Sequence, residues 1–165
     1  MGCYFEILER TKQQLDVMLL YHSRIMVVRV DLHLHDYSDD NLLLSKFIRK
    51  IRRRLREKYG LKRLGFVWVR EREKAKKQHY HLAVMLDANK VNYPGGVLQV
   101  VDNVWKGWAQ PKPYTPENCY YIIHRGFFSE YQNAFFRLSY MAKERGKGCK
   151  SKTANDYSTS RIRLT

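Results

Sequence analysis

The chain of 165 residues is long enough for one domain with its own core, and 44% of its residues are hydrophobic. Its 31 Lys and Arg residues outnumber 16 Asp and Glu residues and leave a formal net charge of +15, which is typical of a protein that binds a phosphate backbone. The absence of a membrane-length apolar stretch and the wide spacing of three cysteines argue against membrane spans, disulfide frameworks and zinc fingers, so we expect a cytoplasmic protein without a membrane partner.

The first half of the chain alternates between helical and extended patterns. Residues 4–21 carry apolar side chains at helical spacing, and residues 24–35 alternate like a strand. One face of that strand holds Arg29, Asp31, His33 and His35. The run SDDN at 38–41 is typical of a helix start, and this helix is expected to end near Gly60. Its outer face is strongly basic, which suits either a solvated surface or a DNA contact.

The second half of the chain predicts a hairpin of residues 65–73 and 78–87, and then a helix at 97–108. A strand at 119–125 and a final helix at 129–145 follow. This order predicts an α+β fold with a central antiparallel β-sheet flanked by α-helices. We expect residues 1–145 to form the domain, with 1–22 as an N-terminal helical extension. Residues 146–165 are expected to form a basic, flexible tail.

Two histidines stand one residue apart in the stretch QHYHLAVMLD at 78–87. In a strand, His79 and His81 point to the same face, and the hairpin brings the acids of VRERE beside them. Either Glu71 or Glu73 then completes a set of two imidazoles and one carboxylate. Such a set suits Mg²⁺ or Mn²⁺ used with phosphates. The alternative is that both glutamates only balance neighbouring basic residues on an exposed hairpin.

The final helix carries a candidate nucleophile. On a helical wheel Tyr140 lies about 180° from Tyr131, whose apolar stripe is expected to face the core. Tyr140 therefore faces away from the core, with Lys143 one turn later. A phenolate oxygen can attack a phosphodiester, and a lysine can stabilise charge on the phosphate. The alternative is a surface tyrosine beside a solvated lysine.

Three motifs together resemble the HUH endonucleases: WVRE at 68–71, HYHLAVML at 79–86 and YMAK at 140–143. The resemblance is closest to rolling-circle replication initiators of the filamentous-phage (inovirus) type, which have one catalytic tyrosine. It implies that the HYH strand lies in the middle of the sheet. It also implies that His79, His81 and Glu71 are metal ligands, that Tyr140 is the nucleophile and that Lys143 assists it.

By this resemblance the protein is expected to nick single-stranded DNA or an origin hairpin, with a 5′-phosphotyrosine intermediate, in a bacterial host or phage-infected cell. A host helicase and polymerase are the implied partners. The expected DNA contacts are Arg29, His33, Arg70, Arg72 and Lys147. Three alternatives remain open: a transposase of the same superfamily, a metal nuclease that uses water, and a non-catalytic module that binds single strands.

Overall fold

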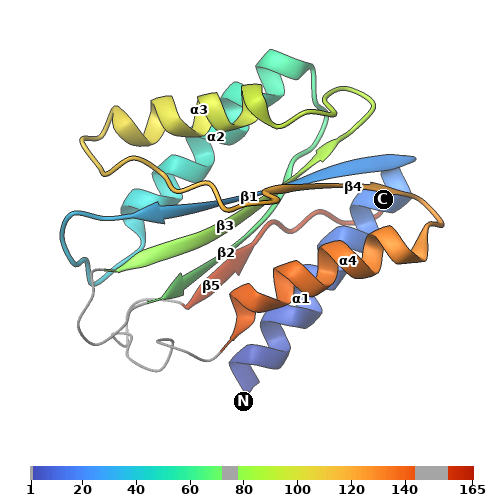
Figure 1. The fold of residues 1–165 in the computed structure, drawn as a ribbon, viewed down its shortest axis with the longest axis horizontal. Coiled ribbons are helices and arrows are strands. Elements are labelled where there is room, and N and C mark those ends of the chain that lie inside the picture. Colours follow the sequence, from blue (N-terminus) through green and yellow to red (C-terminus); the bar gives the residue numbers. More distant parts are fainter. Residues whose placement is uncertain (1, 72–77, 144–155) are drawn as a thin grey trace.

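Five antiparallel strands form a central sheet in the computed structural model, which describes residues 2–71, 78–143 and 156–165 (Figure 1). The strands lie in the order β4-β1-β3-β2-β5. Their bounds are Arg24–His33 for β1, Gly65–Glu71 for β2, His79–Asp87 for β3, Tyr120–His124 for β4 and Tyr157–Thr159 for β5. The α+β fold is confirmed, and the HYH strand, β3, is the middle strand.

Helices cover both faces of the sheet (Figure 1). Their bounds are Gly2–Tyr21 for α1, Leu42–Tyr59 for α2, Gly95–Lys106 for α3 and Phe128–Ser139 for α4, with a 3₁₀ turn, η1, at Tyr140–Ala142. Strand alternation divides the apolar side chains into two cores. One core lies under α2 and α3, and the other lies under α1, α4 and η1. None of the helices in the described ranges is long and apolar enough to cross a membrane.

Helix α1 belongs to the core. Ile7, Leu15 and Met18 are buried together with side chains of β2 and β3, because their helical spacing presents one apolar stripe to the sheet. Residues 2–21 are therefore an integral layer of the domain, not an extension added to it.

The prediction of a flexible tail is wrong for residues 156–165. Here β5 pairs with the outer edge of β2. The Ser160 amide donates a hydrogen bond to the Phe66 carbonyl, and the Phe66 amide donates one to the Ser160 hydroxyl. The Ser160 hydroxyl also donates to Gln14 of α1 at 2.6 Å. Local sequence gave no signal for this strand, since it is three residues long and is stabilised by pairing and buried polar contacts. Residues 146–155 lie outside the described ranges.

Both ends of α2 follow from the sequence. The Asp40 carboxylate accepts a hydrogen bond from the Leu42 amide at 3.0 Å, which satisfies one of the free donors of the first turn. At the other end Gly60 adopts φ 65°, a left-handed conformation in which a side chain is strained, and its amide donates to the Arg56 carbonyl. The predicted start at SDDN and end near Gly60 are thus confirmed.

Arg70, expected to contact DNA, is instead buried behind the sheet. It lies between Val69 and Glu71 and therefore points to the opposite face, toward the loop before α2. Its guanidinium donates to the Ser38 carbonyl, to Asn41 Oδ1 at 3.1 Å and to Gln78 Oε1 at 2.9 Å. With no free donor face toward solvent, Arg70 ties β2 to the α2 loop. The prediction of a DNA contact at this residue is wrong.

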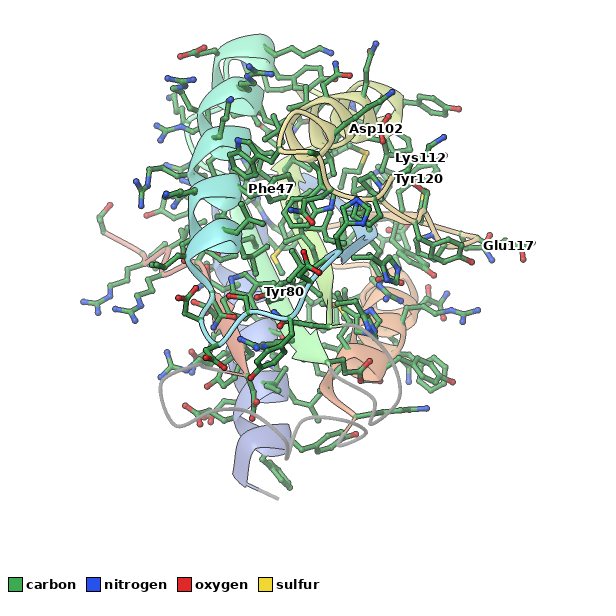
Figure 2. All side chains as sticks on the ribbon, turned by 90° about the vertical axis from the view of Figure 1, so that its left-hand side faces the viewer. Phe47, Tyr80, Asp102, Lys112, Glu117 and Tyr120 are labelled. Atoms are coloured by element: carbon green, nitrogen blue, oxygen red, sulfur yellow. The ribbon has the colours of Figure 1, made fainter. Side chains whose placement is uncertain are left out.

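Tyr80, the residue between the two histidines, completes this buried network. Its hydroxyl accepts from Gln78 Nε2 and donates to Asn41 Oδ1, both at 2.8 Å, and burial raises its pKa to about 12. The ring packs edge-on against Trp68. Figure 2 labels Tyr80. By strand alternation its side chain anchors β3 from the face opposite to the histidines.

Replacing Tyr80 by Phe is expected to lower the free energy of unfolding by about 1–3 kcal/mol, because Gln78 and Asn41 lose a buried partner. Chemical denaturation measures this change. Tyr120→Phe is the control, since Tyr120 is 37% exposed and its hydroxyl has no such network. Equal denaturation midpoints for Tyr80→Phe and wild type would contradict the structural role.

Candidate active site

The ends of three adjacent strands bring polar side chains together on the α1 and α4 face of the sheet. The β2–β3 register places Glu71 opposite His79 and Val69 opposite His81. On the other side of β3, β1 places Asp31 opposite His81 and His33 opposite His79. The candidate site is therefore built on paired strands, whose register fixes the relative positions of its side chains.

Glu71, His79 and His81 have the geometry of a metal-ligand set. Glu71 Oε2 lies 2.7 Å from His81 Nε2 and 3.3 Å from His79 Nε2. One ligand atom from each residue lies within 4.8 Å of the others, and the three side chains are 15–16% exposed. This is the one cluster of three or more such groups in the part of the chain that the structure describes. Two imidazoles and a carboxylate fit a divalent cation and leave coordination positions for substrate.

Asp31 holds one of these imidazoles in place, a role that the sequence analysis missed. Its Oδ1 lies 2.7 Å from His81 Nδ1, so Nδ1–H donates to the carboxylate and Nε2 is directed at Glu71. Carboxylates behind metal-binding histidines fix the ring and the tautomer in this way. Alternation along β1 already set Asp31 on the face of His33, but only the pairing of β1 with β3 placed it opposite His81.

Asp31→Asn is expected to weaken Mn²⁺ binding by roughly 10–100-fold, because the amide no longer fixes the His81 ring through a charged hydrogen bond. Isothermal titration calorimetry measures the dissociation constant. The control is Asp87→Asn, which changes a second aspartate–histidine pair, Asp87 Oδ2 to His22 Nδ1 at 3.3 Å, outside the site. Equal affinities for Asp31→Asn and wild type would refute the positioning role.

The two carboxylates also change the protonation of His81. Burial alone would lower its pKa, but hydrogen bonds to Asp31 and Glu71, with their negative charges, outweigh burial and raise the pKa to about 9. The metal-free site therefore holds a proton at neutral pH. A protonated Nε2 has no lone pair, so a metal ion must displace that proton.

Mn²⁺ affinity is consequently expected to rise with pH, by up to about tenfold per pH unit, and to level off near the His81 pKa of about 9. Titration calorimetry at several pH values below 9 measures the slope. An affinity that stays constant from neutral pH to pH 9 would show that binding displaces no proton from His81.

His33 lies beside the ligand set rather than on an open surface. Its ring stacks on His79 with centroids 5.3 Å apart, and its pKa is lowered by burial and by the neighbouring His79. A neutral His33 supports the orientation of the His79 ring. Its predicted DNA contact stays a prediction.

Tyr140 lies in η1, directly after α4, on the same face of the sheet. The predicted helix to residue 145 ends earlier, at Ser139. Met141 and Ala142 are buried in the core that contains Val69, and η1 contacts β2. Tyr140 itself is 39% exposed. The helical-wheel prediction that Tyr140 faces away from the core is therefore confirmed, although Tyr140 lies in a 3₁₀ turn and not in an α-helix.

Two side chains frame the Tyr140 ring. Lys143 Nζ lies 3.9 Å from the ring centroid, and the Phe136 ring packs edge-on with centroids 5.3 Å apart. Phe136 is 58% exposed. An exposed aromatic ring beside a tyrosine offers a stacking surface for a nucleobase, and the ammonium adds positive charge for a phosphate.

The remaining residues that were predicted to belong to the site are Arg29, Arg72, Glu73 and Lys147. The Arg29 guanidinium lies 3.6 Å from Asp31 Oδ1 and is 14% exposed, so it belongs to the charged surroundings of the site. Glu73, Arg72 and Lys147 lie outside the described ranges. Of the two glutamates considered as third ligand, Glu71 lies beside the histidines, and the choice between it and Glu73 stays a prediction.

Comparison with known proteins gives a family. The family model of the YagK/YfjJ C-terminal domain matches residues 1–157, which include all four helices and the residues of the candidate site. No curated protein matches the chain, and no solved structure does.

Proposed function

The chain belongs to the YagK/YfjJ C-terminal domain family, and from its site we propose that it is a metal-dependent, sequence-specific DNA endonuclease and strand transferase of the HUH type. The observation that carries the proposal is the convergence of Glu71, His79 and His81 on the sheet face that also carries η1. A net charge of +15 supports a nucleic-acid substrate.

In this proposal the residues of the ligand set hold Mg²⁺ or Mn²⁺. A divalent cation at such a site supplies positive charge that polarises a phosphate oxygen. Asp31 keeps the His81 ring in the ligand orientation by accepting its Nδ1 proton in a hydrogen bond. Glu71 and both histidines are half-buried on paired strands, which holds this arrangement in place before substrate arrives.

Tyr140 is the proposed nucleophile. Its phenolic oxygen loses a proton and forms a bond to phosphorus, while the bond from phosphorus to the 3′ oxygen breaks and that oxygen gains a proton. The products are a 5′-phosphotyrosine and a free 3′-hydroxyl. One phosphate ester replaces another, so the step is reversible and the same residue can rejoin ends. Lys143 stabilises charge on the phosphate, and Phe136 stacks on a neighbouring base.

Single-stranded DNA or an origin hairpin is the substrate that suits this arrangement. A phosphate in an accessible, unstacked strand can reach a half-exposed tyrosine, and its bases are free to stack on Phe136. Initiation of rolling-circle replication in the cytoplasm of a bacterial or phage-infected cell is the proposed setting, with a host helicase and polymerase as partners. Transposition is the second setting in which the same chemistry is used.

A denaturing gel tests the proposal. The protein is incubated with Mn²⁺ and a set of labelled single strands from the DNA surrounding its gene, with and without chelator. We expect a metal-dependent cleavage product and a labelled band at the mass of protein plus DNA. Cleavage without that band would favour a nuclease that uses water, and binding without cleavage would favour a non-catalytic module.

A further inference from the structure

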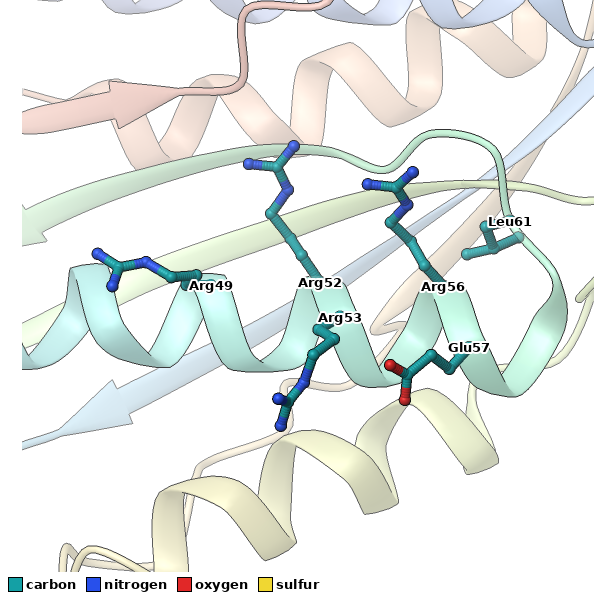
Figure 3. Close-up of a pocket in the computed structure, with 6 residues that line it drawn as sticks. All are labelled: Arg49, Arg52, Arg53, Arg56, Glu57 and Leu61. Atoms are coloured by element: carbon teal, nitrogen blue, oxygen red, sulfur yellow. The ribbon is translucent and has the colours of Figure 1, made fainter.

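The proposed chemistry does not use a second basic feature, which lies on the opposite face of the sheet. A groove of about 530 Å³ opens on the flank of α2, above β2 (Figure 3). It is lined by Arg49, Arg52, Arg53, Arg56, Glu57 and Leu61, and we refer to it as the arginine groove. The apolar side chains of α2 lie in the core under α2 and α3, whereas Glu71 and the histidines lie on the other face of the sheet. The sheet therefore separates the groove from the candidate site.

The spacing of the basic residues explains the groove. Leu44, Phe47, Ile51 and Leu55 turn one side of α2 into the core, and the arginines at positions 49, 52 and 56 follow each other on one flank of that side. Figure 3 shows Arg52 and Arg56 extending in parallel from the helix, while Arg53 and Glu57 extend to its other side. From Arg49 to Arg56 the helix rises about 10 Å, at 1.5 Å per residue.

The guanidinium groups in the groove have no ion-pair partner among the residues that the structure describes. None of the ion pairs found among residues 2–71, 78–143 and 156–165 involves Arg49, Arg52 or Arg56. Glu57 is the one acidic residue among the six that line the groove. Like charges this close repel each other, and an anion between them removes the repulsion.

Arg52 is the most restrained of these side chains. Its guanidinium lies 5.7 Å from the Phe66 ring centroid, and its Nε is buried without a hydrogen-bond partner in the described parts of the chain. Burial, and to a smaller extent the charge of Arg56, lower its pKa. A buried donor next to a second guanidinium is a site with unused capacity for an acceptor.

We propose that the arginine groove binds the phosphate backbone of duplex DNA next to the strand that is nicked. The inference rests on the proposed function for the choice of DNA as the ligand. Three arginines over about 10 Å cover about three nucleotide steps of one strand, at 3.4 Å per step along the axis. None of the described residues that line the groove is aromatic, so they offer phosphate contacts without the stacking surface that single strands use.

A lipid surface fits this flank less well than DNA. Basic helices that bind membranes carry exposed large apolar residues beside their cations. Among the described residues of α2, the one large apolar side chain that is exposed is Leu42 at its first position, and none of the residues that line the groove is an exposed large apolar one. The groove is also concave, which suits a ridge of phosphates rather than a plane.

Fluorescence anisotropy with a short labelled duplex tests the inference. The protein carries Tyr140→Phe and the buffer contains EDTA, so binding is read without any nicking. We compare it with the further variant Arg49→Gln/Arg52→Gln/Arg56→Gln. We expect more than about tenfold weaker binding at 0.1 M salt and a salt slope reduced by about 2.7, at about 0.9 per phosphate contact.

The matched control is Lys90→Gln/Lys106→Gln/Lys112→Gln, which removes the same charge from exposed positions that do not line the groove. It is expected to change affinity by less than about threefold, since distant surface charges are screened. If the triple arginine variant unfolds, Arg49→Gln/Arg56→Gln retains the half-buried Arg52 and is expected to reduce the slope by about 1.8.

Equal losses in the arginine and lysine variants, or no loss in either, would overturn the inference. Unchanged duplex binding, with lost binding to vesicles of phosphatidylcholine and phosphatidylserine, would assign the groove to a lipid surface instead. Because the assay needs no nicking, its result is separate from that of the adduct assay. Groove-dependent duplex binding by a protein that never forms an adduct would refute the proposed function and retain the groove as a site for duplex DNA.

Discussion

Tyr140→Phe is expected to abolish the covalent protein–DNA adduct and to lower the rate of nicking by roughly 10³-fold or more, because the variant lacks the oxygen that is proposed to form the bond to phosphorus. The ring and its contacts with Phe136 and Lys143 remain, so the fold and DNA binding should change little. Labelled substrate on a denaturing gel measures the adduct, and a time course measures the rate.

Two other tyrosines serve as controls. The Tyr131 hydroxyl donates to Asp16 at 2.7 Å, and Tyr157 lies in β5 at the sheet edge; burial raises the pKa of both, which disfavours a phenolate. Tyr131→Phe and Tyr157→Phe should still form the adduct. An adduct that persists in Tyr140→Phe and disappears in either control would mean that the nucleophile is assigned to the wrong residue.

His81→Ala is expected to weaken Mn²⁺ binding by more than roughly 100-fold and to remove metal-dependent nicking, since it deletes the ligand that lies between Asp31 and Glu71. Thermal unfolding gives a readout independent of activity. Mn²⁺ at about 100 times its dissociation constant is expected to stabilise the wild-type protein by about 2.7 kcal/mol and to leave the variant unchanged.

The control for the metal prediction is His124→Ala. His124 also contacts a glutamate, with Nδ1 3.0 Å from Glu130 Oε1, but lies on the edge strand β4 without a second histidine. His79→Ala is a second test of the ligand set, because its contact with Glu71 is longer and its loss disturbs the metal-free site less. Metal-induced stabilisation that survives in both His79→Ala and His81→Ala would place the metal elsewhere.

The arrangement of β2 and β3 could be predicted from sequence because it depends only on local signals. Strand alternation gives the shared face of His79 and His81, and the antiparallel pairing of two strands that are close in sequence brings Glu71 alongside. Both follow without knowledge of the remaining fold. The order of the sheet does not, and for this reason Asp31 was not recognised as the partner of His81.

Arg70 and residues 156–165 show a different limit. A basic residue in a strand is usually exposed, yet Arg70 is buried because distant Ser38, Asn41 and the nearby Gln78 supply acceptors. The strand β5 has no apolar pattern of its own and exists because β2 offers an edge. In both cases the stabilising contacts are tertiary, and single-sequence periodicity carries no information on them.

The most direct test of the central claim is to identify the residue that becomes linked to DNA. After reaction with Mn²⁺, nuclease trimming and tryptic digestion, mass spectrometry locates the remaining nucleotide. Cleavage after Arg137 and Lys143 gives the peptide 138–143, LSYMAK, whose single tyrosine is Tyr140. We predict the nucleotide on this peptide, dependent on metal and on His81. A nucleotide on peptide 126–137 or 153–161, which contain Tyr131 and Tyr157, would contradict the assignment.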